Sequence, residues 1–189
     1  MKTPCIPLNV RSCYSFLDST LSPEAIVRLA VQHELPAIAV TDTGALHGAP
    51  ELARAAKEAG VKAVFGAEVF IGASPLLLYV ENARGWENLC RLLSRKATVD
   101  DDTVAALHRR PLRREALDGM ADGLIAVSGD TALATLFPGR FYRAVTSARD
   151  DTHGLPGVVC PRVHYAVPQD RLKWDILQSI RTGDRKSVV

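Results

Sequence analysis

The chain has 189 residues, of which 47% are hydrophobic and 23% are charged, and its formal net charge is +2. This composition excludes a disordered chain, a collagen and a coiled coil, and the length predicts about one domain. The near-neutral charge argues against a surface that binds nucleic acid over its whole extent, because such a surface requires an excess of basic residues.

Features that would direct the chain to a membrane or to secretion are missing from the sequence. No apolar run is long enough to cross a bilayer, and the opening residues MKTPCIPLNV lack a signal-peptide pattern. Cysteines without a CxxC pair in such a chain are expected to be reduced thiols, so we expect a cytoplasmic protein without a membrane partner. The four cysteines are Cys5, Cys13, Cys90 and Cys160.

The first predicted elements are a short strand at residues 6–10 and a helix that begins near Ser22. Serine caps the free amide groups of a first turn, and the following Pro23 fits that turn. We expect Pro36 to close the helix, since proline cannot continue it.

A strand–helix–strand unit follows. Residues 37–41 read AIAVT, a continuous apolar run that is typical of a strand buried on both faces. A helix is predicted at 48–59 and a second strand at 61–71, which we expect to be broken near Gly66. This spacing predicts a parallel pair of strands joined by a right-handed crossover.

The remainder of the chain predicts further strands at 75–80, 123–127, 141–145 and 158–160. A short helix is expected to begin near residue 100, and the basic stretch 108–114 is interpreted as a solvated helix face, with a phosphate contact as the alternative.

Two further helices are expected to have an apolar face. The first turns four side chains inward: Trp86, Leu89, Cys90 and Leu93. The last is ended by Gly183 and has a stripe of Leu172, Ile176 and Ile180. The pattern predicts an α/β fold with enough strands for a barrel.

Three blocks in register carry a resemblance to a known family. They are LNVRSCYSFLDS at 8–19, AIAVTDTGALHG at 37–48 and VFGAEVF at 64–70. Together they resemble the PHP (polymerase and histidinol phosphatase) domain at the N-terminus of the bacterial DNA polymerase III α subunit. Weaker similarity continues to residue 183, so the resemblance covers nearly the whole chain in the order of the family.

The resemblance implies a PHP-type distorted seven-stranded β/α barrel over residues 1–183, with 184–189 as a tail leading towards an absent polymerase region. This barrel is expected to be shortened, because the stretch between residues 145 and 158 is too short for the helix that the family places there. A barrel without that helix either opens on one side or is covered there by another surface, and the exposed apolar flank would be a docking site.

Active members of the family gather metal ions at the carboxyl ends of the barrel strands, with His, Asp and Glu as ligands. In this sequence three ligand-capable residues remain at the family positions: Asp42, Glu68 and His164. Four other positions depart from the pattern. Asn9 and Arg11 replace the HxH pair, Thr43 replaces the His of TDHG, and Arg162 replaces the Asp of the terminal Asp-x-His motif.

The two arginines suggest what became of the metal site. A guanidinium group pairs well with a carboxylate and opposes a cation in the same pocket. Our hypothesis is that Arg11 and Arg162 take the space and charge role of the metals, with Asp42 and Glu68 as their structural ion-pair partners. No cofactor is then expected, and one divalent Zn or Mn ion held by Asp42, Glu68 and His164 is the alternative.

Two functions follow from the resemblance. The first is a structural and protein-docking module in DNA replication, with the polymerase III core and a proofreading exonuclease subunit as partners and DNA met only indirectly. The second is a residual metal-dependent phosphoesterase or 3′–5′ exonuclease. Polymerase activity itself is not expected in this chain, since the family places those catalytic carboxylates in a palm domain downstream.

Overall fold

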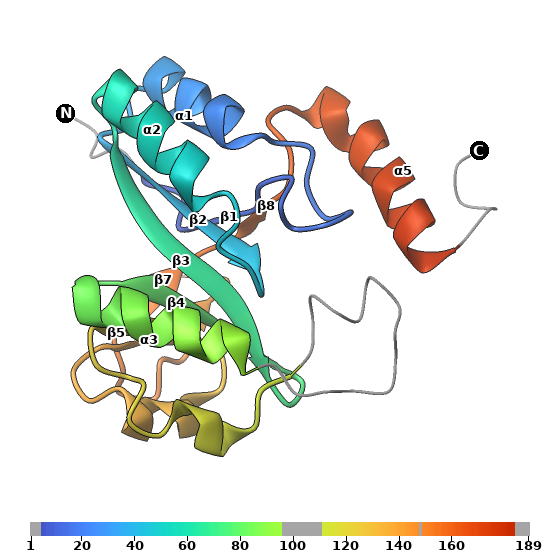
Figure 1. The fold of residues 1–189 in the computed structure, drawn as a ribbon. Helices are drawn as coiled ribbons and strands as arrows, with labels where there is room; N and C mark the ends of the chain where they lie inside the picture. Colours follow the sequence, from blue (N-terminus) through green and yellow to red (C-terminus); the bar gives the residue numbers. More distant parts are fainter. Residues whose placement is uncertain (1–4, 96–110, 148, 184–189) are drawn as a thin grey trace.

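The computed structural model describes residues 5–95, 111–147 and 149–183, and it has mixed α/β architecture (Figure 1). The strands are β1 (Asn9–Val10), β2 (Ala37–Thr43), β3 (Lys62–Ile71), β4 (Ser74–Val80), β5 (Leu124–Ser128), β6 (Phe141–Val145), β7 (Gly157–Val159) and β8 (Arg162–Val163). The α-helices are α1 (Pro23–Gln32), α2 (Ala49–Ala59), α3 (Ala83–Ser94) and α5 (Arg171–Thr182). Short 3₁₀ helices lie at Arg114–Leu117 (η1), Thr131–Leu136 (η2) and Pro168–Asp170 (η3).

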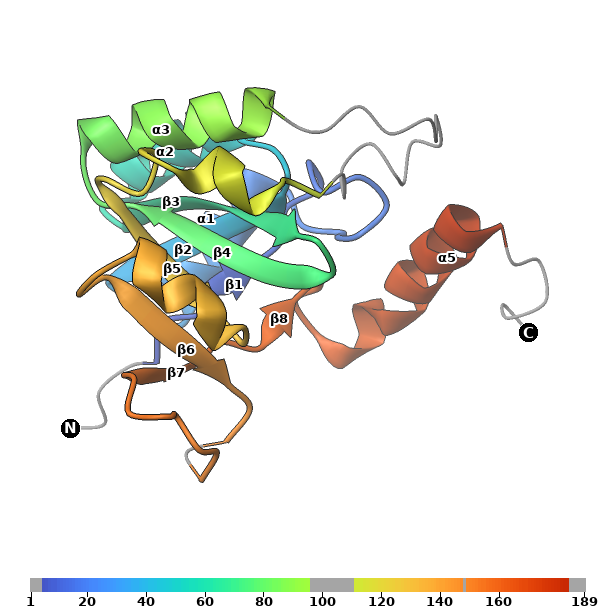
Figure 2. The same ribbon diagram turned by 90° about the horizontal axis from the view of Figure 1, so that it is seen from below.

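The sheet is a curled half-barrel. Six strands pair in the order β2-β3-β4-β5-β6-β7, and β1 and β8 form a separate parallel pair (Figures 1 and 2). Strands β2 and β3 are parallel, as predicted, whereas β4 is antiparallel to both β3 and β5. The predicted α/β barrel, shortened and open on one side, is therefore confirmed in its overall class.

Helix α1 begins where the sequence predicts and ends earlier. The Ser22 hydroxyl accepts a hydrogen bond from the backbone N–H of Ala25 (3.2 Å), and Pro23 occupies the first turn. The helix ends at Gln32, before the expected stop at Pro36. Glu34 has a φ of 53°, a left-handed conformation that no α-helix can contain, so the turn itself ends the helix.

Strand β3 runs without a break, so the interruption predicted near Gly66 is wrong. Gly66 has a different structural role in the strand. A Cβ atom at Gly66 would lie 2.6 Å from the carbonyl oxygen of Leu78 on the neighbouring strand β4. Glycine therefore permits a close approach of two backbones, which is one of its known uses inside a strand.

Three apolar clusters surround the sheet. The inner face of the half-barrel packs Ala39, Leu77, Tyr79 and Val127. The outer face of β2 packs against α1 and α2 through Ile26, Val27, Ile38, Val40 and Leu52. The outer face of β4 and β5 packs against α3 and η2 through Leu76, Leu78, Leu89, Leu92, Leu124 and Leu133.

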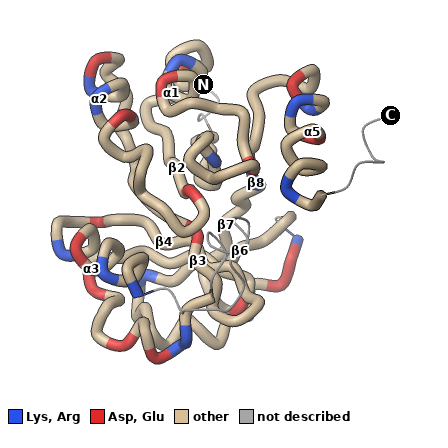
Figure 3. The backbone as a smooth tube through the Cα atoms, turned by 45° about the vertical axis from the view of Figure 1, so that its right-hand side comes forward, with Lys and Arg blue, Asp and Glu red and all other residues tan. Residues whose placement is uncertain are grey.

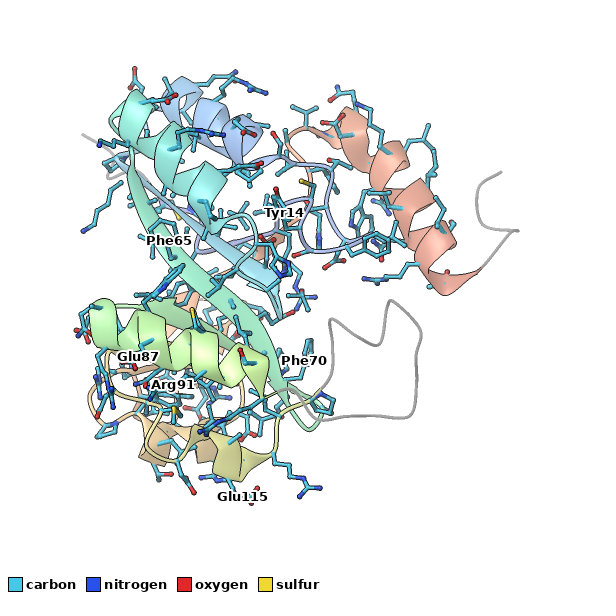
Figure 4. All side chains as sticks on the ribbon, viewed as in Figure 1. Tyr14, Phe65, Phe70, Glu87, Arg91 and Glu115 are labelled. Atoms are coloured by element: carbon cyan, nitrogen blue, oxygen red, sulfur yellow. The ribbon has the colours of Figure 1, made fainter. Side chains whose placement is uncertain are left out.

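Helix α3 differs from the prediction in which residues face inward. Leu89 is fully buried and Leu93 partly buried, as expected, whereas Trp86 is 39% exposed. Trp86 instead packs edge-on against Phe65 of β3, with ring centroids 5.9 Å apart; Phe65 is labelled in Figure 4. The deepest positions of the helix include Gly85, where a Cβ would lie 1.8 Å from the Gly123 carbonyl oxygen. Gly85 thus lies against the backbone of Gly123, and its neighbour Trp86 lies at the edge of the core.

The described residues between β6 and β7 form turns and no helix, which confirms the missing crossover. The helix predicted near residue 100, residues 108–110 of the basic stretch and the tail 184–189 lie outside the described residues. Leu112 of that stretch is buried and bridges to Ile71, so this part is not a solvated helix face. Within the described ranges, no helix is long and apolar enough to cross a membrane.

Candidate functional site

The candidate site lies at the carboxyl ends of the neighbouring parallel strands β2 and β3. Their register pairs Thr43 with Glu68 and Asp42 with Ala67. Registered residues point to the same face of a sheet, and successive residues point to opposite faces. Thr43 and Glu68 therefore share the inner face of the half-barrel, whereas Asp42 lies on the outer face.

Glu68 is the centre of an ionic cluster on the inner face, here called the Glu68 cluster and defined as Glu68, Arg11 and Arg162. The carboxylate is buried, and its Oε1 atom contacts Nη2 of Arg11 at 2.7 Å and Nη2 of Arg162. The Thr43 hydroxyl donates to the other oxygen, Oε2, at 3.3 Å. Both carboxylate oxygens thus have donors, and two guanidinium groups face one carboxylate.

Strands β1 and β8 place the two arginines. These strands pair in parallel, with Asn9 opposite Arg162, so both side chains belong to one face. The backbone N–H of Arg11 continues the ladder by donating to the Val163 carbonyl (2.9 Å). Asn9 accepts a hydrogen bond from the Thr41 hydroxyl at 3.2 Å. The pairing of two short strands therefore sets the position of both cations.

Arg11 has an unusual environment for a charged residue, because its side chain has no exposed surface. Burial lowers the pKa of the Arg11 guanidinium, and the neighbouring Glu68 raises it. Within the described part of the chain, none of the three guanidinium nitrogens of Arg11 makes a hydrogen bond, and the contact of Nη2 with Glu68 is an ion pair only. The buried positive charge consequently depends on Glu68 for its closest compensation.

Asp42 has neutral partners instead of an arginine. Its Oδ1 accepts hydrogen bonds from the Ser12 backbone N–H and the Ser15 hydroxyl, each at 2.7 Å, and its Oδ2 accepts from the Ser12 hydroxyl at 2.6 Å. These contacts fix the loop after β1 against the end of β2. The expected ion pair of Asp42 with Arg11 or Arg162 is not formed, because its carboxylate lies on the other face of β2 and is used by Ser12 and Ser15. At longer range the Asp42 charge still raises the pKa of Arg11.

His164 belongs to a third group of contacts, beside the loop that contains Asp18. Its Nδ1 lies 2.6 Å from the Asp18 carbonyl oxygen, so we assign the proton to that nitrogen. Burial lowers the pKa of His164, opposed by the adjacent Asp18 carboxylate. Arg181 of α5 donates to Asp18 Oδ1 at 3.0 Å, and the Trp174 ring lies 5.1 Å from the His164 ring. His164 therefore helps to attach α5 to the body of the domain.

The three ligand-capable residues thus lie in three different environments. Among the residues that the structure describes, no group of three or more His, Cys, Asp or Glu side chains is placed to hold a metal ion. The donor set at the strand ends does not fit one either, since Glu68 faces two cations and the carboxylate of Asp42 is used by serines. Figure 3 shows that most of the other charged residues lie on helices and outer loops.

Sequence reasoning missed several residues of this region. Ser12 and Ser15 lie within the first family block, but their contact with Asp42 joins positions 30 and 27 residues apart, and no local spacing reveals it. Arg181 is still farther from Asp18 in sequence. Tyr14, labelled in Figure 4, was also missed, and its hydroxyl donates to Glu51 of α2 at 3.0 Å. The only available signal was the density of hydroxyl groups in residues 12–20.

The chain is similar to several known proteins. It is 30% identical to an error-prone DNA polymerase of Symbiobacterium thermophilum, over 95% of this chain and 21% of that protein. It is 32% identical to the DNA polymerase III subunit alpha of Chlamydia trachomatis, over 69% of this chain and 12% of that protein. The chain thus spans between about an eighth and a fifth of the length of these curated relatives.

A solved structure supports the fold. An amidohydrolase from Chromobacterium violaceum, determined with bound sulfate and no metal, superposes with a TM-score of 0.54 at 16% sequence identity. The match covers 85% of this chain and 87% of that one.

The sequence also matches the PHP domain family over residues 7–147, which include β1 to β6 and the carboxylates of Asp42 and Glu68. The chain therefore belongs to the PHP domain family.

Proposed function

We propose that this chain acts in the cytoplasm as the PHP domain of a bacterial replicative or error-prone DNA polymerase, where it is a structural and protein-docking module without metal chemistry. Its similarity to polymerase III alpha and error-prone polymerase chains supports a role in replication. The polymerase core is the partner in this proposal, with a proofreading exonuclease subunit as a further candidate.

The observation that carries the proposal is the Glu68 cluster. A divalent cation bound at Glu68 would have to displace Arg11 and Arg162 from the same oxygen atom. Metal binding at His or Cys proceeds by loss of a ligand proton, but a guanidinium group does not give up its proton in proteins. The arginines would therefore remain as two positive charges beside the ion, which Coulomb repulsion opposes.

The other two ligand-capable residues support the same conclusion. The carboxylate of Asp42 is already used by three hydrogen bonds, and His164 directs Nδ1 to a backbone carbonyl. Such interactions stabilise the loops at the open end of the barrel. The former reaction centre of the family thus serves here, in our proposal, to hold β1, β2, β3 and β8 together.

Metal content and nuclease activity test the proposal. The full chain, purified without chelator, is expected to contain less than stoichiometric Zn or Mn and to leave single-stranded DNA intact in the presence of Mn²⁺. The matched positive control restores the family pattern with the substitutions Asn9→His, Arg11→His, Thr43→His and Arg162→Asp. This variant is expected to bind a divalent ion, because the arginines are replaced by imidazole and carboxylate ligands.

Two results would overturn the proposal. One is stoichiometric metal in the unmodified chain. The other is Mn²⁺-dependent cleavage that is lost in the variant Asp42→Ala, which would support the residual phosphoesterase or exonuclease. Circular dichroism verifies that the four-fold control variant is folded. If that variant binds no metal, the result then reflects its ligands and not unfolding.

A further inference from the structure

Among the described α-helices, α5 is the one without a buried residue. It lies at one side of the molecule, apart from α1, α2 and α3 (Figures 1 and 2), and none of its residues is fully buried. Three aliphatic side chains one turn apart form the α5 stripe, defined as Leu172, Ile176 and Ile180. They are 64%, 38% and 61% exposed. The apolar stripe of a helix normally faces a partner, so this orientation requires an explanation.

The opposite face of α5 explains why the stripe points outward. Gln178 donates to the Leu17 carbonyl at 2.8 Å, and Trp174 donates from its indole nitrogen to the Asp18 carbonyl at 3.1 Å. Arg181 adds the contact with the Asp18 carboxylate. These mainly polar contacts attach the helix in one orientation and leave the stripe directed away from the domain.

Such an arrangement costs stability unless the stripe is covered in the working assembly. A helix of 12 residues is marginal by itself in water and normally gains its stability by burying an apolar face. Here the attachment comes from hydrogen bonds, each of which contributes only about 1 kcal/mol net, from the Arg181–Asp18 ion pair and from the packing of Trp174 against His164 and Tyr165. The stripe is therefore not part of the core that the described residues form, and it is open to a partner.

A second copy of the chain is a poor candidate for that partner. Two α5 helices packed against each other are each about 18 Å long and would bury little beyond the stripe. Stable specific interfaces bury about 1,200–2,000 Å². A larger body that forms a groove around the helix meets this requirement better.

The relatives indicate which body this is. In the error-prone polymerase of Symbiobacterium thermophilum, the matched region includes 95% of this chain but only 21% of the polymerase, so about four-fifths of that protein lies outside it. We infer that the α5 stripe is the docking surface of this domain for a polymerase body that presents an apolar groove and that lies, as in that relative, on the same polypeptide. This inference rests on the proposed function and assigns that docking to a particular helix face.

Site-specific photocross-linking in the native host tests the inference on the intact chain. Ile176 is replaced by the photoreactive amino acid benzoylphenylalanine, and the matched control carries the same replacement at Val31, which is 50% exposed on α1. The cross-linked peptides are identified by mass spectrometry. The probe at 176 is expected to cross-link to a DNA polymerase sequence, and the probe at 31 is not.

A second measurement tests the stripe itself. With the probe at Lys173, whose side chain is 72% exposed beside the stripe, the substitutions Leu172→Ser, Ile176→Ser and Ile180→Ser are expected to lower the polymerase cross-link about tenfold or more. The single substitution Val31→Ser is the control and should leave the yield unchanged. Because all four side chains are exposed, the variants are expected to fold.

The outcomes separate the inference from the proposed function. A polymerase cross-link from position 31 and none from 176 would overturn the inference and leave the proposed function intact. Cross-links from 176 only to a second copy, or only to residues within 1–189, would also overturn the inference. A polymerase cross-link from neither position would count against both. A Lys173 cross-link that the three serines do not weaken would show that the stripe is not the docking surface.

Discussion

Glu68 and Asp42 are two buried carboxylates one row apart on neighbouring strands, and they are stabilised by different chemistry. Glu68 faces the interior of the half-barrel and two arginines, whereas Asp42 faces outward and accepts three hydrogen bonds from Ser12 and Ser15. Strand alternation separates them, since Glu68 is in register with Thr43 and not with Asp42. Adjacent positions in a motif can therefore have independent roles.

The two carboxylates stabilise their neighbours in different ways: Glu68 compensates a buried charge, and Asp42 accepts hydrogen bonds. The guanidinium of Arg11 is fully buried and needs a nearby negative charge, because an uncompensated ion in the interior costs several kcal/mol. The hydrogen-bond partners of Asp42, Ser12 and Ser15, are neutral, so its removal costs mainly hydrogen bonds. Its charge also stabilises the Arg11 cation, but less than the charge of Glu68 does. Disrupting the Glu68 cluster is therefore expected to cost more than disrupting the Asp42 contacts.

The largest expected effect is that of Arg11→Met. Removing this cation leaves Glu68 buried with only the partly exposed Arg162 and is expected to lower the free energy of unfolding by about 3–5 kcal/mol. Urea denaturation monitored by circular dichroism measures the loss. The control is Arg54→Met, which removes a surface ion pair to Glu24 (3.9 Å) and should change stability by about 0–1 kcal/mol.

A double substitution sharpens this result. If the cost arises from an uncompensated Glu68 charge, adding Glu68→Leu to Arg11→Met should restore part of the lost stability, since a buried ion pair can often be exchanged for apolar residues at little cost. Strict additivity of the two single substitutions would show that the pair is not coupled.

The second prediction concerns Asp42→Ala. Loss of an ionised acceptor leaves the Ser12 amide and two hydroxyl groups unpaired in the interior, and we expect a loss of about 2–3 kcal/mol in unfolding free energy. The matched control is Asp150→Ala. Asp150 also accepts three hydrogen bonds, from Thr146 and Ser147, but it is only partly buried and these hydrogen bonds are exposed to solvent.

In the control, water can replace the lost acceptor, so its effect on the urea midpoint should be clearly smaller. Equal effects of Asp42→Ala and Asp150→Ala would mean that burial does not decide the strength of these contacts. A cost of Asp42→Ala that exceeds that of Arg11→Met would reverse the comparison between the two carboxylates.

The smallest expected effect is a pH dependence that comes from His164. Burial lowers its folded-state pKa below the ordinary value of 6.5, opposed by Asp18, while Arg162 and Arg11 lower it further. The unfolded chain therefore binds a proton near pH 6.5 that the folded chain takes up only at lower pH. Stability is fully present above about pH 6.5 and falls as the pH drops below it.

Thermal unfolding between pH 7.5 and 5.5 measures this effect. The melting temperature of the unmodified chain should fall on acidification, and His164→Gln should reduce that fall. His153→Gln is the control, because His153 lies on an exposed turn. An unchanged pH profile in His164→Gln would show that protonation of this residue does not affect the folded state.

The sequence by itself determined much of this protein. Hydrophobic periodicity and caps such as Ser22 and Gly60 predicted the β2–α2–β3 unit and most helix ends, because these signals are local. The family blocks identified the positions of Asp42 and Glu68, and the terminal Asp-x-His motif identified that of His164. The shortened connection between β6 and β7 was also visible as a lack of residues.

Only the tertiary structure decided which of these side chains contact one another. No spacing in the sequence shows that Glu68 meets Arg11 and Arg162, residues 57 and 94 positions away, while Asp42 turns to Ser12. Likewise, the period of the α5 stripe is readable in the sequence, but its outward direction follows from contacts that hold the other face. The physical reason is that strand register and long-range polar contacts are set by the whole fold, whereas local propensities set only the elements.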